Sequence, residues 1–137
     1  MSAAHRAASF YKQVDLESSV ATADKHQLIA LLFDGLISSL VAAEHQLDHN
    51  NIRAKCDSIS RACRILVGLQ GSLDHEKGGE IARNLADLYA YAMRRLFKAN
   101  IDNDKNIIVE VRTLLSEIQE AWATVPEILR EQKLASA

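Results

Sequence analysis

The 137-residue sequence contains one proline and five glycines, so it has few residues that would interrupt a helix. Aromatic residues make up only 5% of the chain, although 48% of it is hydrophobic. A chain of this length can bury one core, and that core must be packed mainly by Leu, Ile, Val and Ala. These shortages argue against many short strands joined by turns, and they favour one domain built from long helices.

The chain also lacks an uninterrupted apolar run of about 18 residues, the length that indicates a transmembrane helix. Residues 1–6 are mostly small or polar and do not resemble the hydrophobic part of a signal peptide. Its two cysteines, Cys56 and Cys63, lie seven residues apart on one expected helix. That spacing corresponds to about 10 Å along the helix axis, too far for a disulfide bond. We therefore expect free thiols in a cytoplasmic protein.

The net charge is only −2, which excludes a strong general attraction to nucleic acid or to an anionic membrane. The charge is uneven, however. Residues 52–101 carry nine basic and five acidic side chains, whereas the residues on either side are acidic overall. A mildly basic face of this kind would suit an acidic partner. The simpler alternative is a solvated surface on which charges of both signs are mixed.

Four segments have the apolar spacing of amphipathic helices. We expect these helices at about 25–48, 52–72, 80–99 and 105–123. Asp24, with Gln27 three residues later, and Asn51 are suited to cap the first two helices. The apolar positions of the first helix are wide enough to indicate contacts on two or three sides. On the second helix we expect a polar outer face with Arg53, Lys55, Arg61 and Arg64. On the third helix we expect an inward seam with Ile81, Leu85, Leu88, Ala92 and Leu96.

The stretch 73–81 contains the only Gly-Gly pair, and we expect it to form the central reversal of the fold. Both glycines are assigned to the geometry of this turn. Short turns between long helices force neighbouring helices to run antiparallel. The predicted fold is all-α, an antiparallel up-down four-helix bundle formed by residues 24–123. We expect an N-terminal segment, 1–23, to dock on the bundle and a short tail helix to lie within 124–137.

No catalytic or metal-binding motif is evident, and we expect neither enzymatic activity nor a metal or other cofactor. His45 and His49 have the i, i+4 spacing of some metal ligands, but no third ligand accompanies them, so two surface imidazoles is the preferred interpretation. An alternative function is a histidine phosphotransfer-type signalling bundle that uses His75. Such domains place Lys-Gly one residue further from the histidine, and one residue rotates a helical side chain by about 100°.

Short motifs follow one another along the chain in a specific order. They are Tyr11-Lys12-Gln13-Val14, Leu28-Ile29, Leu32-Phe33-Asp34-Gly35, Leu73-Asp74, Gly78-Gly79-Glu80-Ile81-Ala82, Asn84-Leu85, Leu88-Tyr89, Ala99-Asn100 and Ala121-Trp122. In this order and spacing they resemble the flagellin-specific export chaperones, the FliS family, over most of the chain. One departure is Asp24-Lys25, where the family commonly has Ser-Pro. Since Asp caps a helix as well as Ser, only the proline of the first turn is lost.

The resemblance implies a cytoplasmic bundle that binds the disordered C-terminal segment of flagellin. It implies that the protein prevents premature polymerisation and assists delivery of flagellin to the flagellar export apparatus. It also implies that the N-terminal segment covers part of the flagellin site and moves when the client binds. The flagellar export gate and regulators of flagellar assembly are further candidate partners. No nucleic acid partner and no membrane insertion are expected.

The residues expected to contact the partner are apolar and lie on three segments. Short amphipathic client helices would dock between the helices of the bundle, and wrapping a large surface would offset the ordering entropy of a disordered client. Tyr11, with Phe10, would anchor the displaceable segment. The alternative is that the candidates on the helices are simply core residues. The full set is Phe10, Tyr11, Ile29, Leu32, Phe33, Leu85, Leu88 and Tyr89.

Overall fold

The computed structural model describes residues 24–125 of the chain. These residues form four helices, and no strand occurs among them. The helices are α2 (Lys25–Asp48), α3 (Ile52–Gly71), α4 (His75–Asp102) and α5 (Lys105–Ala123). The prediction of an all-α fold with four helices is confirmed. The predicted N-terminal segment, and all but the first two residues of the predicted tail, lie outside the described residues.

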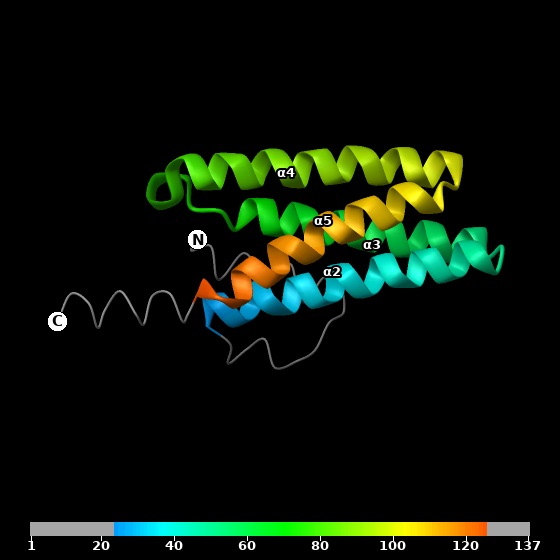
Figure 1. Cartoon of the computed structure of the whole chain (residues 1–137), viewed down its shortest axis with the longest axis horizontal. Coiled ribbons are helices and arrows are strands. Elements are labelled where there is room, and N and C mark those ends of the chain that lie inside the picture. Colours follow the sequence, from blue (N-terminus) through cyan, green and yellow to red (C-terminus); the bar gives the residue numbers. More distant parts are fainter. Residues whose placement is uncertain (1–23, 126–137) are drawn as a thin grey trace.

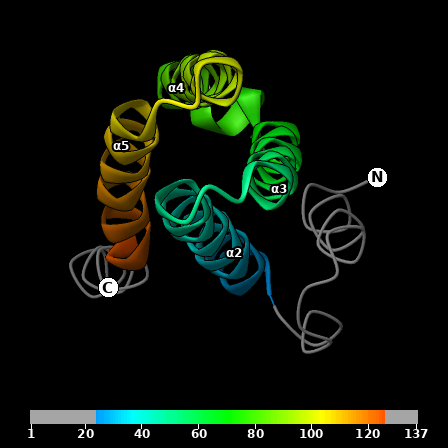
Figure 2. The same cartoon turned by 90° about the vertical axis from the view of Figure 1, so that its right-hand side faces the viewer.

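The four helices form a ring in which each helix packs against the next and α5 packs against α2 (Figure 2). In Figure 1 the chain runs from left to right along α2 and α4, and back along α3 and α5. The connecting turns hold two or three residues, so successive helices are direct neighbours. As a result, the N-terminal ends of α2 and α4 meet the C-terminal ends of α3 and α5 at one end of the bundle.

An aliphatic core fills the space between the helices. Helix α2 contributes more of the buried residues than any other helix, in agreement with the wide apolar surface expected for it. By length and composition α2 could also span a membrane, but half of its most apolar window is buried inside the bundle, as in the core helix of a soluble protein. Fully buried core residues from the four helices include Phe33, Leu36, Leu40, Ile65, Leu66, Leu96, Ile108 and Leu115.

The N-terminus of each helix is fixed by a capping residue. The Asp24 carboxylate accepts a hydrogen bond from the Gln27 amide at 2.8 Å, and the Gln27 side chain accepts one from the Asp24 amide at 3.1 Å. This is the predicted capping box. Asn51, Asp74 and Asp104 cap α3, α4 and α5 in the same way through their side-chain oxygens. Each cap acts within three residues, and the starts of α2, α3 and α5 agree with the predicted helices, whereas α4 starts at His75 and not at about residue 80.

The central reversal is shorter than the predicted turn at 73–81. Only residues 72–74 lie outside a helix, and α4 begins at His75. Gly79 interrupts α4 with φ 50° and ψ −123°, a conformation that lacks a steric penalty only when there is no Cβ. A Cβ at Gly78 would lie 2.8 Å from the Cβ of Ala82. The turn assignment is therefore right for Gly79, whereas Gly78 is required for close packing against the next turn of its own helix.

Lys55 was expected on the outer face of α3 but is buried, with only 1% of its surface exposed. Its ammonium group donates hydrogen bonds to the backbone oxygen and to Oδ1 of Asn100, both at 2.8 Å. Asn100 lies in the last turn of α4, where helix carbonyl groups lack intrahelical partners. Lys55 thus ties α3 to α4 at the end of the bundle away from the central reversal.

Candidate partner-binding pocket

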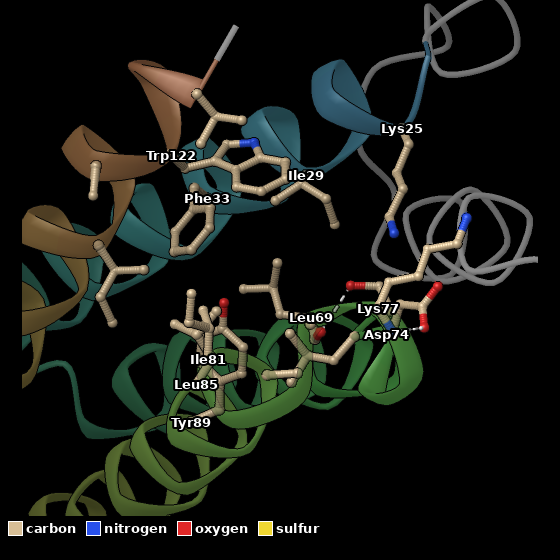
Figure 3. A pocket seen from close by; sticks show the side chains of 17 residues that line it. Lys25, Ile29, Phe33, Leu69, Asp74, Lys77, Ile81, Leu85, Tyr89 and Trp122 are labelled. Atoms are coloured by element: carbon tan, nitrogen blue, oxygen red, sulfur yellow. Dashed lines mark hydrogen bonds between the residues drawn. The ribbon is translucent and has the colours of Figure 1, made fainter. Parts of the chain in front are cut away.

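An apolar pocket of about 480 Å³ opens at the end of the bundle where the central reversal lies (Figure 3). All four helices supply side chains to its walls, because α2 and α4 begin here and α3 and α5 end here. The apolar residues that form most of the lining are Ile29, Phe33, Leu69, Leu73, Ile81, Leu85, Tyr89, Ile118 and Trp122.

Four of the eight predicted contact residues line this pocket, two from α2 and two from α4. They are Ile29, Phe33, Leu85 and Tyr89. Leu32 is fully buried and Leu88 is half-buried, and neither lines the pocket. Phe10 and Tyr11 lie outside the described residues. The structure thus brings residues of the first and third predicted helices together at one site.

The four pocket-lining candidates also belong to the core or pack against it. Ile29, Phe33 and Tyr89 are buried, and Leu85 is half-buried against the core. Their inner surfaces therefore stabilise the bundle while the remaining edges form the inner wall of the pocket. The core interpretation therefore holds for Ile29, Phe33 and Tyr89, and contact of the four residues with a partner stays a prediction.

Ile81 was expected to face inward, on the seam that continues through Leu85. Instead it stands at the pocket with 71% of its surface exposed, the largest fraction among the exposed large hydrophobic residues of the described chain. It lies two residues after the break at Gly79. The apolar seam in the sequence predicted that Ile81 is a packing residue, whereas the described part of the chain leaves it largely exposed.

One wall of the pocket is formed by Trp122 of α5. Its indole ring stacks on the imidazole of His26, with ring centroids 4.8 Å apart and the planes inclined by 14°. The indole Nε1 donates to the His26 backbone oxygen at 3.2 Å, and His26 Nε2 is hydrogen-bonded to the Trp122 backbone oxygen at 3.0 Å. These contacts fix the end of α5 to the first turn of α2.

Two lysines, Lys25 and Lys77, lie on the same side of the pocket as Asp74 (Figure 3). The Asp74 carboxylate accepts a 3.0 Å hydrogen bond from the Lys77 amide as it caps α4. This bond, together with the positive charges of Lys77 and Lys25, lowers the pKa of Asp74. Within residues 24–125, neither lysine has a carboxylate at ion-pair distance.

The phenol of Tyr89 is a further polar group of the pocket lining, and in Figure 3 it points toward Phe33. Ser72 also lines the pocket, but its hydroxyl donates to the Leu69 backbone oxygen. Tyr89 is only 3% exposed, and its burial raises the pKa of the hydroxyl to about 12. The hydroxyl is therefore neutral and can donate a hydrogen bond. Among the described residues it has no hydrogen-bond partner.

The histidines outside the pocket give little support to a phosphotransfer or metal-binding function. His75, the candidate phosphoacceptor, is exposed as the first residue of α4 and does not lie in the middle of a helix face. His45 and His49 pack together with ring centroids 4.2 Å apart, and His49 Nδ1 is hydrogen-bonded to the His45 backbone oxygen. No group of three potential metal ligands occurs within the described range.

Comparison with known proteins identifies the family. A family model described as "Flagellar protein FliS" matches residues 7–128. The flagellar secretion chaperone FliS of Salmonella typhimurium is 50% identical over 116 residues, which cover 84% of this chain and 86% of the relative. FliS of Escherichia coli is 42% identical over 113 residues, covering 82% and 83%, and FliSB of Pseudomonas aeruginosa is 40% identical over 119 residues, covering 87% and 94%. The chain therefore belongs to the FliS family of flagellar secretion chaperones.

Proposed function

We propose that this protein is a cytoplasmic flagellar export chaperone that binds the disordered C-terminal segment of flagellin. In this role it prevents premature polymerisation of flagellin and assists its delivery to the flagellar export apparatus. The observation that carries the proposal is an open apolar pocket, with the highly exposed Ile81 beside it, in a chain of the FliS family.

The dimensions of the pocket suit part of a client peptide. Its volume of about 480 Å³ falls within the range of about 300–1,000 Å³ that is usual for ligand pockets. The lining is mainly aliphatic and aromatic, so it favours the apolar face of a short client helix. A flagellin segment held in this way could not offer the same apolar face to another flagellin molecule.

Binding must also be reversible if the client is to be handed over for export. A disordered segment loses conformational entropy when it becomes ordered on the bundle, and this cost offsets part of the gain from apolar burial. The N-terminal segment, through Phe10 and Tyr11, covers the pocket in the free protein and is displaced by the client. Neither nucleotide nor metal is needed for this exchange.

The direct test is isothermal titration of the full-length protein with a peptide from the C-terminal segment of the cognate flagellin. Ile81→Ser is the informative variant, because Ile81 is largely exposed and contributes little to the core. Full burial of an isoleucine is worth about 1.5–3 kcal/mol. Because 71% of the Ile81 surface is still exposed and can be buried by the client, loss of this contact should cost about 1–2 kcal/mol and weaken client binding about 5- to 30-fold. The thermal unfolding temperature should stay near that of the unmodified protein.

Ile101→Ser provides a matched control. Ile101 is 65% exposed and lies on the same helix, near the end away from the pocket. Its replacement should change client affinity by less than about twofold, as expected for an exposed side chain without a contact. Unchanged affinity in Ile81→Ser, or an equal loss in both variants, would exclude this pocket as the client site.

A further inference from the structure

The pocket has two polar features that an apolar client face leaves unused. Lys25 and Lys77 lie together at one side of it, and the Tyr89 hydroxyl lies at its inner wall (Figure 3). A site that only had to hold aliphatic side chains would need none of these groups. Their chemistry therefore carries information about which client segments fit.

The lysine side of the pocket is a favourable place for an added negative charge. Lys25 and Lys77 line the pocket with a single carboxylate, Asp74, and that carboxylate is already engaged in capping α4. The nearby acids Asp24 and Glu76 do not line the pocket. Helix α2 begins here and contributes the partial positive charge of its N-terminus, whereas the break at Gly79 divides α4 after its first turn. The charges of the two lysines and the partial charge of the helix N-terminus are all positive, so they favour an anionic group on the bound segment.

The Tyr89 hydroxyl is a second polar feature that a ligand can use. Among the described residues only Arg95 Nε is a buried polar side-chain atom without a hydrogen-bond partner, so the Tyr89 hydroxyl keeps contact with water in the pocket and exchanges that contact for a ligand acceptor on binding. Tyr89 is more than nine-tenths buried, lines the pocket and has no hydrogen-bond partner within residues 24–125. A bound peptide would supply the missing acceptor through one of its backbone carbonyl oxygens.

We infer that the pocket selects client segments in which a large apolar side chain stands next to an aspartate or glutamate. The apolar side chain packs against Ile81 and the inner wall, and the neighbouring carboxylate lies between the ammonium groups of Lys25 and Lys77. The Tyr89 hydroxyl donates a hydrogen bond to the client backbone. This inference rests on the proposed function, since it specifies which segment of the client occupies the same pocket.

The test is a thermodynamic cycle between protein and client. The protein and its Lys25→Gln/Lys77→Gln double variant are titrated with the flagellin C-terminal peptide. Both are also titrated with a copy of the peptide in which acids next to large apolar residues are replaced by their amides. For the unmodified protein, the amide peptide should bind about 3- to 10-fold more weakly at low salt, as expected for ion pairs at an exposed rim. For the double variant, the two peptides should bind within about twofold of each other.

The matched control for net charge is Arg53→Gln/Arg94→Gln. Both arginines are exposed, neither lines the pocket, and within the described range neither takes part in an ion pair. This control should retain the full difference between the acidic peptide and the amide peptide. If the two peptides differ in affinity by the same factor in all three proteins, the effect of charge is general and the inference is overturned.

Tighter client binding by the Lys25→Gln/Lys77→Gln variant would also overturn it. That result would mean that the lysines hold an acidic segment of the chain itself, such as the one containing Asp15 and Glu17, and not the client. Tyr89→Phe should weaken client binding about two- to fivefold without lowering the unfolding temperature. Unchanged client affinity in Tyr89→Phe would show that the hydroxyl does not contribute to client binding.

The outcomes separate this inference from the proposed function. If Ile81→Ser leaves binding unchanged, the pocket is not the client site and both proposals fail. If Ile81→Ser weakens binding but the cycle shows no coupling between the lysines and the client acids, the inference fails alone and the proposed function stands.

Discussion

Replacement of Lys55 by methionine should lower the free energy of unfolding by about 2–3 kcal/mol. Methionine preserves most of the apolar stem, so the substitution creates little cavity and mainly removes the ammonium group. The two 2.8 Å bonds to Asn100 are then lost. An orphaned buried carbonyl costs about 1–3 kcal/mol, and loss of a cation at a helix C-terminus adds about 0.3–1 kcal/mol.

The assay is equilibrium unfolding in urea, with Arg53→Met as the control. Arg53 is an exposed basic residue of the same helix, and its replacement should change stability by no more than about 0.5 kcal/mol. Asn100→Ala removes only one of the two acceptors, so it should cost less than Lys55→Met. The double variant should show a coupling of about 1 kcal/mol between the two side chains.

Lys55 stabilises the fold only if its bonds to Asn100 outweigh the cost of burying an ammonium group. Desolvation of a buried charge costs several kcal/mol and can cancel its hydrogen bonds. If Lys55→Met is as stable as the unmodified protein, or more stable, the bonds do not outweigh this cost. Lys55 would then be retained for a reason other than stability.

Two further predictions concern the central reversal. Gly79→Ala should lower the free energy of unfolding by about 1–3 kcal/mol, because alanine is strained at φ 50°. In urea unfolding, Gly71→Ala should lower the free energy of unfolding by less than Gly79→Ala does, since Gly71 does not have a positive φ and a Cβ added there meets no described residue beyond its own part of the chain within 4 Å. Asp74→Asn keeps the cap but removes its charge. Because the folded pKa of Asp74 lies below the ordinary value of 3.8, the unmodified protein should exceed this variant in stability at neutral pH and lose the difference as pH falls through the folded pKa. Equal differences at pH 7 and pH 3 would contradict this.

Features that depend on neighbouring residues could be read from the sequence. The start of α2 follows from the reciprocal bonds of Asp24 and Gln27, and the start of α3 follows from the bond between Asn51 and the Ala54 amide. These interactions span three residues, so they form whenever the local sequence is present. For that reason the predicted bounds of α2 agree with the structure at both ends.

Features that depend on distant residues could not be read in this way. Helical periodicity placed Lys55 on the polar face of α3, but its partner Asn100 is 45 residues away on another helix. A long side chain can also bury its stem while its charged end finds a partner. A lysine on the predicted polar face of a helix is therefore not always exposed. Whether Lys55 is buried or exposed depends on where α4 packs relative to α3.

The same limit applies to the candidate pocket. Ile29, Phe33, Leu85 and Tyr89 were predicted as contacts from apolar positions on or beside the inward faces of the first and third helices, and all four line the pocket. The seams could not show which positions lie where the helices diverge and leave a gap. Leu32, at a seam position of the same kind, is enclosed by the bundle and does not line the pocket.

The location of the pocket also explains how a small bundle can keep an apolar site open and remain folded. Leu40 and Ile108 are fully buried, and Lys55 joins α3 to α4 at the far end. At the pocket end, the backbone break at Gly79 interrupts α4 just before Ile81, which is left largely exposed. The burial of such a side chain is worth about 1.5–3 kcal/mol, so the bundle formed by residues 24–125 forgoes that stabilisation, and a segment that covers Ile81 gains it. In the proposed function, this free energy is available first to the N-terminal segment and then to the client that displaces it.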